Sequence, residues 1–291
     1  MLNRNIPKDF FKTLNEKEYF ISENEQNINL EDNSHYTNYD EFIFSDIYQK
    51  YLKNRWNFIV SKNNKKYNNV MDICCGVGNT GIAISLEIHT KNLDFVDISK
   101  EQLRICKEKT KNISDVNINI IEKDIFLLDK NNHYELIIGN SFIHHFPDVI
   151  KYVKKIREFL KEDGEFIVLH EPSITAGYIE YFPFSIGISH IIKKLFNKNY
   201  KKPFTTTDLW NFKEKELKKL FYKAGYSEIK IKRNGFLSVI LINPFLIFFG
   251  KYEKIKKILF TIKVFLEKVD NKLEKVLPSF FFCYFIICAK K

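Results

Sequence analysis

The sequence predicts an α/β protein with an open, doubly wound, mostly parallel sheet. Three observations lead to this prediction. Short apolar runs typical of buried strands alternate with helical patterns along the middle of the chain. The first of these runs enters a glycine-rich turn that opens a helix. Polar and acidic residues follow several of the strands, which is where sheets of this kind bind ligands.

Composition sets broad bounds on the protein. With 291 residues, 45% hydrophobic and 28% charged, the chain can bury its own core and is not wholly disordered. A net charge of +10 suits nucleic acid, anionic lipid or an acidic substrate, and selects none of them. The five cysteines lie in apolar runs without C-x-x-C pairing, which indicates reduced, buried thiols in a cytosolic protein and no metal site. The N-terminus lacks the apolar stretch of a secretory signal.

The chain is expected to divide into a lead-in and one main domain. Residues 1–61 are polar and end in an amphipathic helix over 40–61, and the domain covers 62–291. The pattern of that helix fits a helix placed beside a ligand and, equally, simple packing on the core.

The first strand, 70–74, carries the residues that indicate a ligand. Gly76, Gly78 and Gly81 let the backbone approach a bound molecule closely. Dinucleotide enzymes and methyltransferases share this glycine pattern. Asp72 favours the second class, because a carboxylate beside the turn repels a diphosphate and attracts a cation such as S-adenosylmethionine.

At these residues the chain resembles the class I S-adenosylmethionine-dependent methyltransferases, in the broad group that includes ubiquinone- and menaquinone-biosynthesis methyltransferases. The resemblance runs from about residue 69 to residue 226 and resumes at the C-terminal strand. It implies a Rossmann-like sheet of seven strands whose last strand is antiparallel, and S-adenosylmethionine as the cofactor.

The next two strands supply further cofactor residues. Strand 93–97 ends in Asp97, whose carboxylate can accept hydrogen bonds from ribose hydroxyls, although a nicotinamide enzyme would use it equally well. Ser99 opens the following helix as a capping box. Strand 116–121 is followed by Asp124 and Ile125, which resemble the family's adenine contact and otherwise form a solvated strand end. The expected cofactor site comprises Asp72, Cys74, Gly76, Gly78, Asp97, Ile98, Asp124, Ile125, Asn140 and Ser141.

Candidate catalytic residues follow strands 134–141 and 165–169. His144, His145 and His170 titrate in the range that a general base needs, if the acceptor holds its proton at neutral pH. His145 is preferred, because similar methyltransferases carry a histidine near this loop that can face the acceptor. The alternative is structural: in members with unrelated substrates, one histidine ring of such a loop only bonds the backbone. Glu171 is the other side chain expected to reach an acceptor.

Two insertions are expected to form a helical cap over the ligand. Segments 173–209 and 235–279 follow strand 165–169 and strand 226–232, and both would meet at the carboxyl edge of the sheet. Apolar residues and lysines mix in both, which fits either a cap that touches an anionic membrane or one that packs on the domain. The apolar part of 236–249 is too short to span a bilayer. Strand 280–289 closes the sheet.

The sequence therefore predicts a cytoplasmic methyltransferase that uses S-adenosylmethionine on a small, apolar or lipid-linked acceptor, and it leaves peripheral contact with an anionic membrane open. The alternatives are a nucleic-acid or protein methyltransferase and a catalytically silent cofactor-binding protein. Nucleic acid is disfavoured, because Asn140-Ser141-Phe142-Ile143 replaces the Asn/Asp-Pro-Pro-Tyr/Phe loop of many amino-methylating enzymes.

Overall fold

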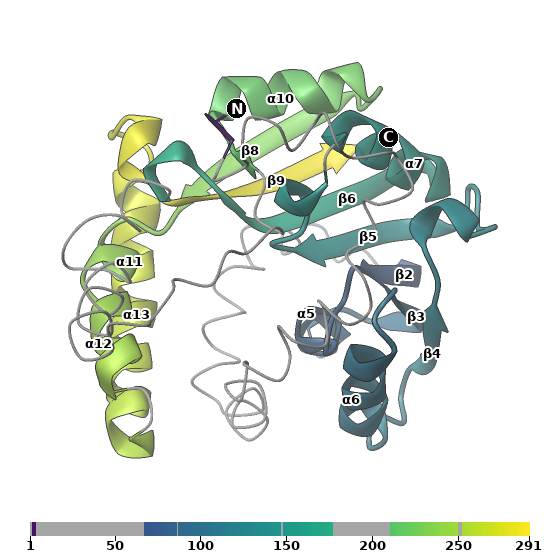
Figure 1. Ribbon diagram of the computed structural model, residues 1–291, viewed down its shortest axis with the longest axis horizontal. Helices are drawn as coiled ribbons and strands as arrows, with labels where there is room; N and C mark the ends of the chain where they lie inside the picture. Colours follow the sequence, from purple (N-terminus) through teal and green to yellow (C-terminus); the bar gives the residue numbers. More distant parts are fainter. Residues whose placement is uncertain (1, 4–66, 86, 147, 177–209, 250–251) are drawn as a thin grey trace, which may run out of the picture.

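A seven-stranded mixed sheet organises the part of the chain that the computed structural model describes, residues 2–3, 67–85, 87–146, 148–176, 210–249 and 252–291. The strand order is β4-β3-β2-β5-β6-β9-β8. Pairing from β4 to β6 is parallel, and β9 runs antiparallel to both of its neighbours, β6 and β8. The predicted doubly wound sheet with an antiparallel last strand is confirmed (Figure 1).

The predicted strands are all present, with altered ends. They are β2 (Tyr67–Ile73), β3 (Thr90–Asp97), β4 (Asn117–Glu122), β5 (Tyr134–Asn140), β6 (Leu160–Pro172), β8 (Glu228–Asn234) and β9 (Tyr284–Lys290). A separate antiparallel pair joins β1 (Leu2–Asn3) to β7 (Trp210–Asn211). The helices are α5 (Asn79–Ser85), α6 (Lys100–Thr110), α7 (Val149–Phe159), α10 (Glu214–Lys223), α11 (Leu237–Ile240), α12 (Asn243–Phe249) and α13 (Glu253–Leu273), with short 3₁₀ turns η2 (Ile125–Leu127), η3 (Ile143–His145) and η4 (Ser279–Phe281).

Local signals in the sequence explain where two helices begin. Ser99 caps α6 by accepting from the amide of Gln102, and Asp148 caps α7 by accepting from the amide of Lys151 at 3.0 Å. The predicted Ser99 cap is thus confirmed. Its own amide donates to Asp97 at 2.9 Å, which ties the start of α6 to the end of β3.

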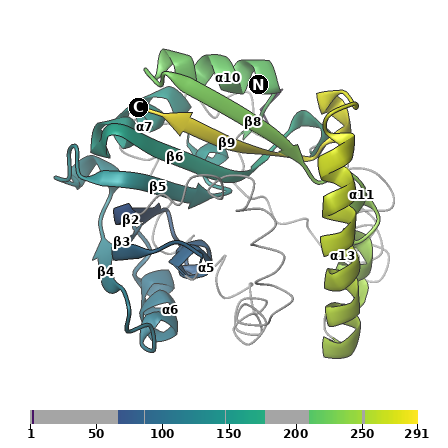
Figure 2. The same ribbon diagram turned by 180° about the vertical axis from the view of Figure 1, so that it is seen from behind.

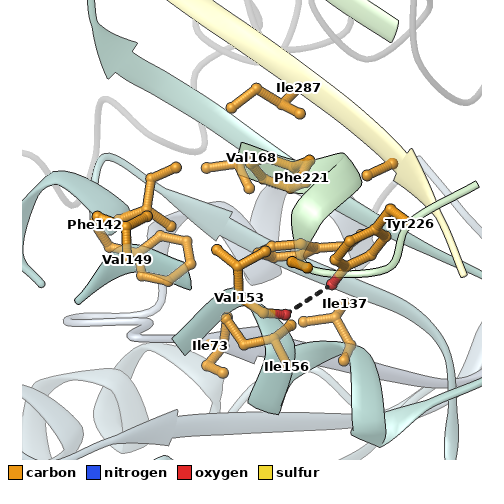
Figure 3. Packing of buried hydrophobic residues seen from close by; sticks show 14 of the residues in the cluster. Ile73, Ile137, Phe142, Val149, Val153, Ile156, Val168, Phe221, Tyr226 and Ile287 are labelled. Carbon is orange, nitrogen blue, oxygen red and sulfur yellow. Dashed lines mark hydrogen bonds between the residues drawn. The ribbon is translucent and has the colours of Figure 1, made fainter. Parts of the chain in front are cut away.

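Two apolar cores lie on opposite faces of the sheet. Helices α7 and α10 pack on one face, where Val153, Ile156 and Phe221 are fully buried among strand residues. Figure 3 shows this core, in which the hydroxyl of Tyr226 donates to the carbonyl oxygen of Val153. Helices α5 and α6 cover the other face, which also receives Val264 of α13. Both faces of the central strands are covered, as their continuous apolar runs require.

The predicted second insertion is helical. It begins directly after β8, and since β6 and β8 both run antiparallel to β9, α11 starts at the carboxyl edge of β6. Helix α13 stands across the ends of β8 and β9, with α11 beside it (Figures 1 and 2). Among the described helices none is long and apolar enough to cross a membrane.

Two expectations fall on residues that are not described. The helix predicted over 40–61 lies outside the described residues, and so does all but the start of the insertion over 173–209.

Strand β6 is longer than the predicted 165–169, because it begins immediately after α7 and pairs with β5 from Leu160 onward.

Candidate functional site

Three residues with left-handed backbone end neighbouring strands of the sheet. Cys74 follows β2 with φ 51°, Ser141 follows β5 with φ 56°, and His170, near the end of β6, has φ 56°. A side chain in this conformation costs roughly 1–3 kcal/mol, and such residues cluster at functional sites. At His170 the pairing of β6 with β9 also shifts register between Val168 and Glu171, as in a bulge that redirects side chains. The strain marks the carboxyl edge as the candidate site.

The glycine turn after β2 is closely packed from behind. Gly76 and Gly78 have φ 54° and 79°, which glycine adopts without strain. A Cβ atom at Gly76 would lie 2.5 Å from Oε1 of Gln102, and one at Gly78 would lie 2.5 Å from Sγ of Cys106. Both neighbours belong to α6. The end of the Gln102 side chain can move aside, whereas Cys106 is fully buried, so packing requires glycine at position 78 in particular. The sequence predicted glycine here so that the backbone can approach a ligand closely. Packing against α6 is a second reason for glycine in this turn.

Asp72 is a buried carboxylate beneath this turn. It is 1% exposed, and its Oδ2 accepts from the amide of Gly81 at 2.7 Å. The pKa of Asp72 is raised to about 8: burial is the main cause, the Gly81 amide opposes the rise, and the nearby charge of Asp97 adds a smaller increase. A cation bound here would favour the ionised carboxylate and so recover part of its burial cost.

Asp97 ties the end of β3 to the turn. Its Oδ2 accepts from the amide of Gly76 at 2.8 Å, and its Oδ1 accepts from the amide of Ser99. Burial raises the pKa of Asp97, and these amide bonds oppose the rise. The Ile98 amide also contributes, and a carboxylate has about four acceptor positions, so one remains for a ribose hydroxyl. The adjacent Ile98 is 40% exposed.

Asp124 and Ile125 lie just after β4, the strand at one edge of the sheet. Asp124 accepts from the amide of Phe126 at 2.7 Å and begins the turn η2, in which Ile125 is buried. This bond leaves the second carboxylate oxygen of Asp124 available to an amino group. Ile125 packs into the core with α7, so its backbone amide rather than its side chain is the group that a ligand could contact.

The carboxylates of this edge act together on one thiol. The pKa of Cys74 is raised well above its usual value, first by burial and then by the charges of Asp97, Asp72, Asp124 and Glu171. These groups come from the ends of four strands and meet around the left-handed turn. These acids make the edge electronegative when they are ionised, which fits a cationic ligand and opposes a diphosphate. The donor set thus fits S-adenosylmethionine, whose sulfonium and ammonium groups are both cationic.

Asn140 and Ser141 occupy the end of β5 beside β6. The amide of Ser141 donates to the carbonyl oxygen of Leu169 at 2.7 Å, and Asn140 is exposed. Oδ1 of Asn140 lies 3.2 Å from Nδ1 of His170. The ring of His170 in turn meets the edge of Tyr284, a contact that no local sequence signal indicated.

The loop after β5 brings the other candidates together. His144 is buried, and its ring centroid lies 4.0 Å from that of the half-buried His145. Glu171 is 0% exposed, and both of its carboxylate oxygens bind the residues of this loop. That Glu171 reaches the acceptor stays a prediction; in the structure its carboxylate accepts from the backbone of this loop. Its partners there are backbone amides, which sequence patterns do not identify.

No metal site emerges from the described ranges, where no group of three or more His, Cys, Asp or Glu side chains is arranged to hold an ion.

Comparison with known proteins gives the same class. Residues 22–241, more than half of the chain, match the ubiE/COQ5 methyltransferase family. The demethylmenaquinone methyltransferase of Staphylococcus carnosus (strain TM300) is 28% identical over 205 residues, which cover 67% of this chain and 83% of that protein. The enzyme of the same name from Staphylococcus saprophyticus subsp. saprophyticus is 28% identical over 179 residues, covering 58% of this chain and 75% of that protein.

A solved structure has the same fold. The phosphoethanolamine N-methyltransferase 2 of Haemonchus contortus, in complex with S-adenosyl-L-methionine, has a TM-score of 0.54 and 15% identity, covering 86% of this chain and 55% of that one. At this identity the likeness shows the fold alone. The family match, the glycine turn and the electronegative strand ends agree, and we conclude that the chain belongs to the ubiE/COQ5 methyltransferase family and is a class I, S-adenosylmethionine-dependent methyltransferase.

Proposed function

We propose that the protein methylates a small, apolar or lipid-linked acceptor of the quinone class, for which demethylmenaquinone is the first compound to test. The structural observation that supports this choice is the helical extension α11–α13, which begins at the carboxyl edge of the sheet and exposes large apolar side chains. The relatives named above, which are demethylmenaquinone methyltransferases, point to the same acceptor. Exposed apolar surface next to the methyl-transfer edge suits a ring with a hydrocarbon tail.

The strand ends are assigned to the cofactor. Asp72 and Asp97 would hold the cation and the ribose, Asp124 and the Ile125 amide the adenine, and the backbone around Cys74, Gly76 and Gly78 the remaining contacts. Ile98, Asn140 and Ser141 complete this set. When bound, S-adenosylmethionine supplies a methyl group on a positively charged sulfur. The chain's own task is to orient the acceptor in line with that methyl, which alone can contribute roughly 7–11 kcal/mol of the barrier.

His145 is assigned the role of general base. The reduced, quinol form of such an acceptor holds its hydroxyl protons at neutral pH, and removing one makes the ring more nucleophilic. An imidazole nitrogen of His145 would take this proton, and general-base catalysis typically contributes 10²–10⁴-fold in rate.

The test is release of S-adenosylhomocysteine with chemically reduced short-chain demethylmenaquinone, with a nucleic acid and a protein extract as competing acceptors. Turnover on the quinol alone is the expected result. His145→Ala should lower kcat at least 10²-fold and leave the Kd for S-adenosylmethionine unchanged. Undiminished turnover of His145→Ala would remove the base assignment, and binding of the cofactor without turnover on any acceptor would favour a silent binding protein.

A peripheral membrane contact is also proposed. Helix α13 exposes Ile258 and Phe265 to 60% and 64%, and Lys254, Lys257 and Lys268 are exposed on the same helix. Each basic residue near an anionic surface contributes roughly 1 kcal/mol. A location in the cytoplasm at the membrane surface follows, and salt-sensitive flotation with anionic vesicles is the measurement. Co-flotation that vanishes with Lys254→Glu/Lys257→Glu would support the contact; no binding to anionic vesicles at low salt would overturn it.

The domain division remains the one expected from the sequence. We infer a methyltransferase domain over 62–291 with caps at 173–209 and 235–279, preceded by the segment 1–61. Limited proteolysis followed by mass spectrometry would test these boundaries.

A further inference from the structure

The loop that precedes α7 occupies every hydrogen-bond acceptor position of the Glu171 carboxylate. Oε1 accepts from the amides of Phe142 at 2.8 Å and Ile143 at 3.1 Å, and Oε2 accepts from the amide of His144 at 3.2 Å. Nδ1 of the His144 ring makes the fourth contact, 2.8 Å from Oε2. A carboxylate offers about four acceptor positions, so these four contacts occupy them all. Glu171 therefore has no lone pair left to accept a proton from a substrate.

Three successive amides that converge on one anion form a backbone nest. The left-handed Ser141 at its start turns the chain so that the amides of residues 142–144 point the same way. Nests commonly bind anionic ligands, whereas here the anion is a side chain of the neighbouring strand β6. Because the partners are 27 to 29 positions apart in the chain, the clamp fixes the loop relative to the sheet.

The residue after His145 is held as well. The indole nitrogen of Trp210 donates to the carbonyl oxygen of Phe146 at 2.8 Å, and the Phe146 ring stacks on Tyr152 at a centroid distance of 3.7 Å. His145 thus lies between two anchored neighbours, His144 on the Glu171 side and Phe146 on the Trp210 side. Its own amide closes the 3₁₀ turn by donating to the carbonyl oxygen of Phe142 at 3.0 Å.

We propose that Glu171 is a positioning residue, whose carboxylate fixes the 142–144 backbone and the His144 ring and thereby places the His145 ring at the acceptor side of the sheet edge. This inference rests on the proposed role of His145. It changes the predicted role of Glu171 from a group that touches the acceptor to one that acts through the loop. Trp210 is the corresponding anchor on the other flank.

The kinetic test combines Glu171→Gln with His145→Ala. The glutamine keeps the shape but offers one acceptor oxygen and points an N–H₂ group at backbone donors, so the clamp is lost. Glu171→Gln should lower kcat about 10- to 100-fold, as expected from a misplacement near 1 Å, and leave the KM and Kd for S-adenosylmethionine unchanged. In the His145→Ala background the same change should have no further effect on kcat. An equal loss of kcat in both backgrounds would overturn the proposal, as would unchanged kcat in the single variant.

Matched variants separate positioning from general destabilisation. Glu165 lies on the same strand and accepts from the hydroxyl of Tyr67 at 2.8 Å. Glu165→Gln removes the charge of this acceptor in the same way but should leave kcat unchanged. Trp210→Phe removes the indole donor of the other anchor and keeps an aromatic ring against the core. It should lower kcat in the same His145-dependent way, so it serves as the second variant if Glu171→Gln does not fold. An effect of Trp210→Phe that is independent of His145 would count against the proposal.

An activity-independent readout distinguishes failure of this inference from failure of the proposed function. In protein labelled at its 7 histidines, the His145 ring, assigned by its loss in His145→Ala, should give one sharp NMR signal. Glu171→Gln should broaden or split that signal. A signal that stays sharp and unshifted would overturn the placement by Glu171 whatever the enzyme's acceptor; a changed signal with undiminished turnover of His145→Ala would instead overturn the base assignment alone.

Discussion

The pKa of Asp72 makes cofactor binding dependent on pH. In the ligand-free protein this pKa is about 8, so at pH 7 only about one molecule in ten carries the carboxylate that a cation needs. The apparent affinity falls by the fraction in the competent state, which means that affinity at pH 7 should lie about tenfold below its limiting value. Each pH unit below 7 should lower the affinity for S-adenosylmethionine by another factor of about ten, or ~1.4 kcal/mol.

Titration calorimetry with S-adenosylmethionine between pH 5.5 and 7 measures this effect, in a range where the cofactor's own α-amino group stays mostly protonated. The expected result is a rise in affinity of about tenfold per pH unit, with release of nearly one proton per cofactor bound at pH 7. Asp72→Asn should bind more weakly and lose most of the pH dependence. Affinity of the unaltered protein that stays flat over this range, or an equal slope in Asp72→Asn, would refute the reasoning.

The same shift has the opposite effect on the stability of the ligand-free fold. An acid whose pKa is higher in the folded than in the unfolded state makes the folded protein bind the extra proton. Between about pH 4 and pH 8 the unfolded state has lost this proton while the folded state keeps it. The free energy of unfolding therefore falls as pH rises through this range. Asp72→Asn should accordingly raise the melting temperature of the cofactor-free protein near pH 7 while weakening binding, and differential scanning calorimetry would detect a change of either sign.

Three further substitutions test the packing around the site. Gly78→Ala should lower the free energy of unfolding by more than about 1 kcal/mol in urea titration, because φ is 79° and the added Cβ would lie 2.5 Å from Sγ of Cys106. Tyr226→Phe should lose about 1 kcal/mol in the same measurement, the worth of its bond to the Val153 carbonyl, and a loss above 3 kcal/mol would contradict this account. Asp270→Ala should abolish hydrogen-exchange protection in α11 and leave α7 protected, because Asp270 accepts from the amides of residues 236–238 and from the Ser238 hydroxyl.

The sequence determined the features that depend on neighbouring residues. Local patterns predict the strand positions, the glycine turn, the cap at Ser99 and the acids at the ends of β2 and β3, because each depends on a few adjacent side chains. These features were enough to give the sheet and the chemical class of its ligand.

Only the tertiary structure decided how distant segments meet at the strand ends. The pairing of β5 with β6 sets Glu171 beneath the amides of residues 142–144, and the register shift against β9 turns His170 toward Tyr284. Backbone amides carry no sequence identity, so no pattern could show that Glu171 is held behind the loop. The physical reason is that sheet register determines which backbone groups lie within hydrogen-bond distance of a buried carboxylate. Register depends on packing across the whole core, so no single segment of the sequence encodes it.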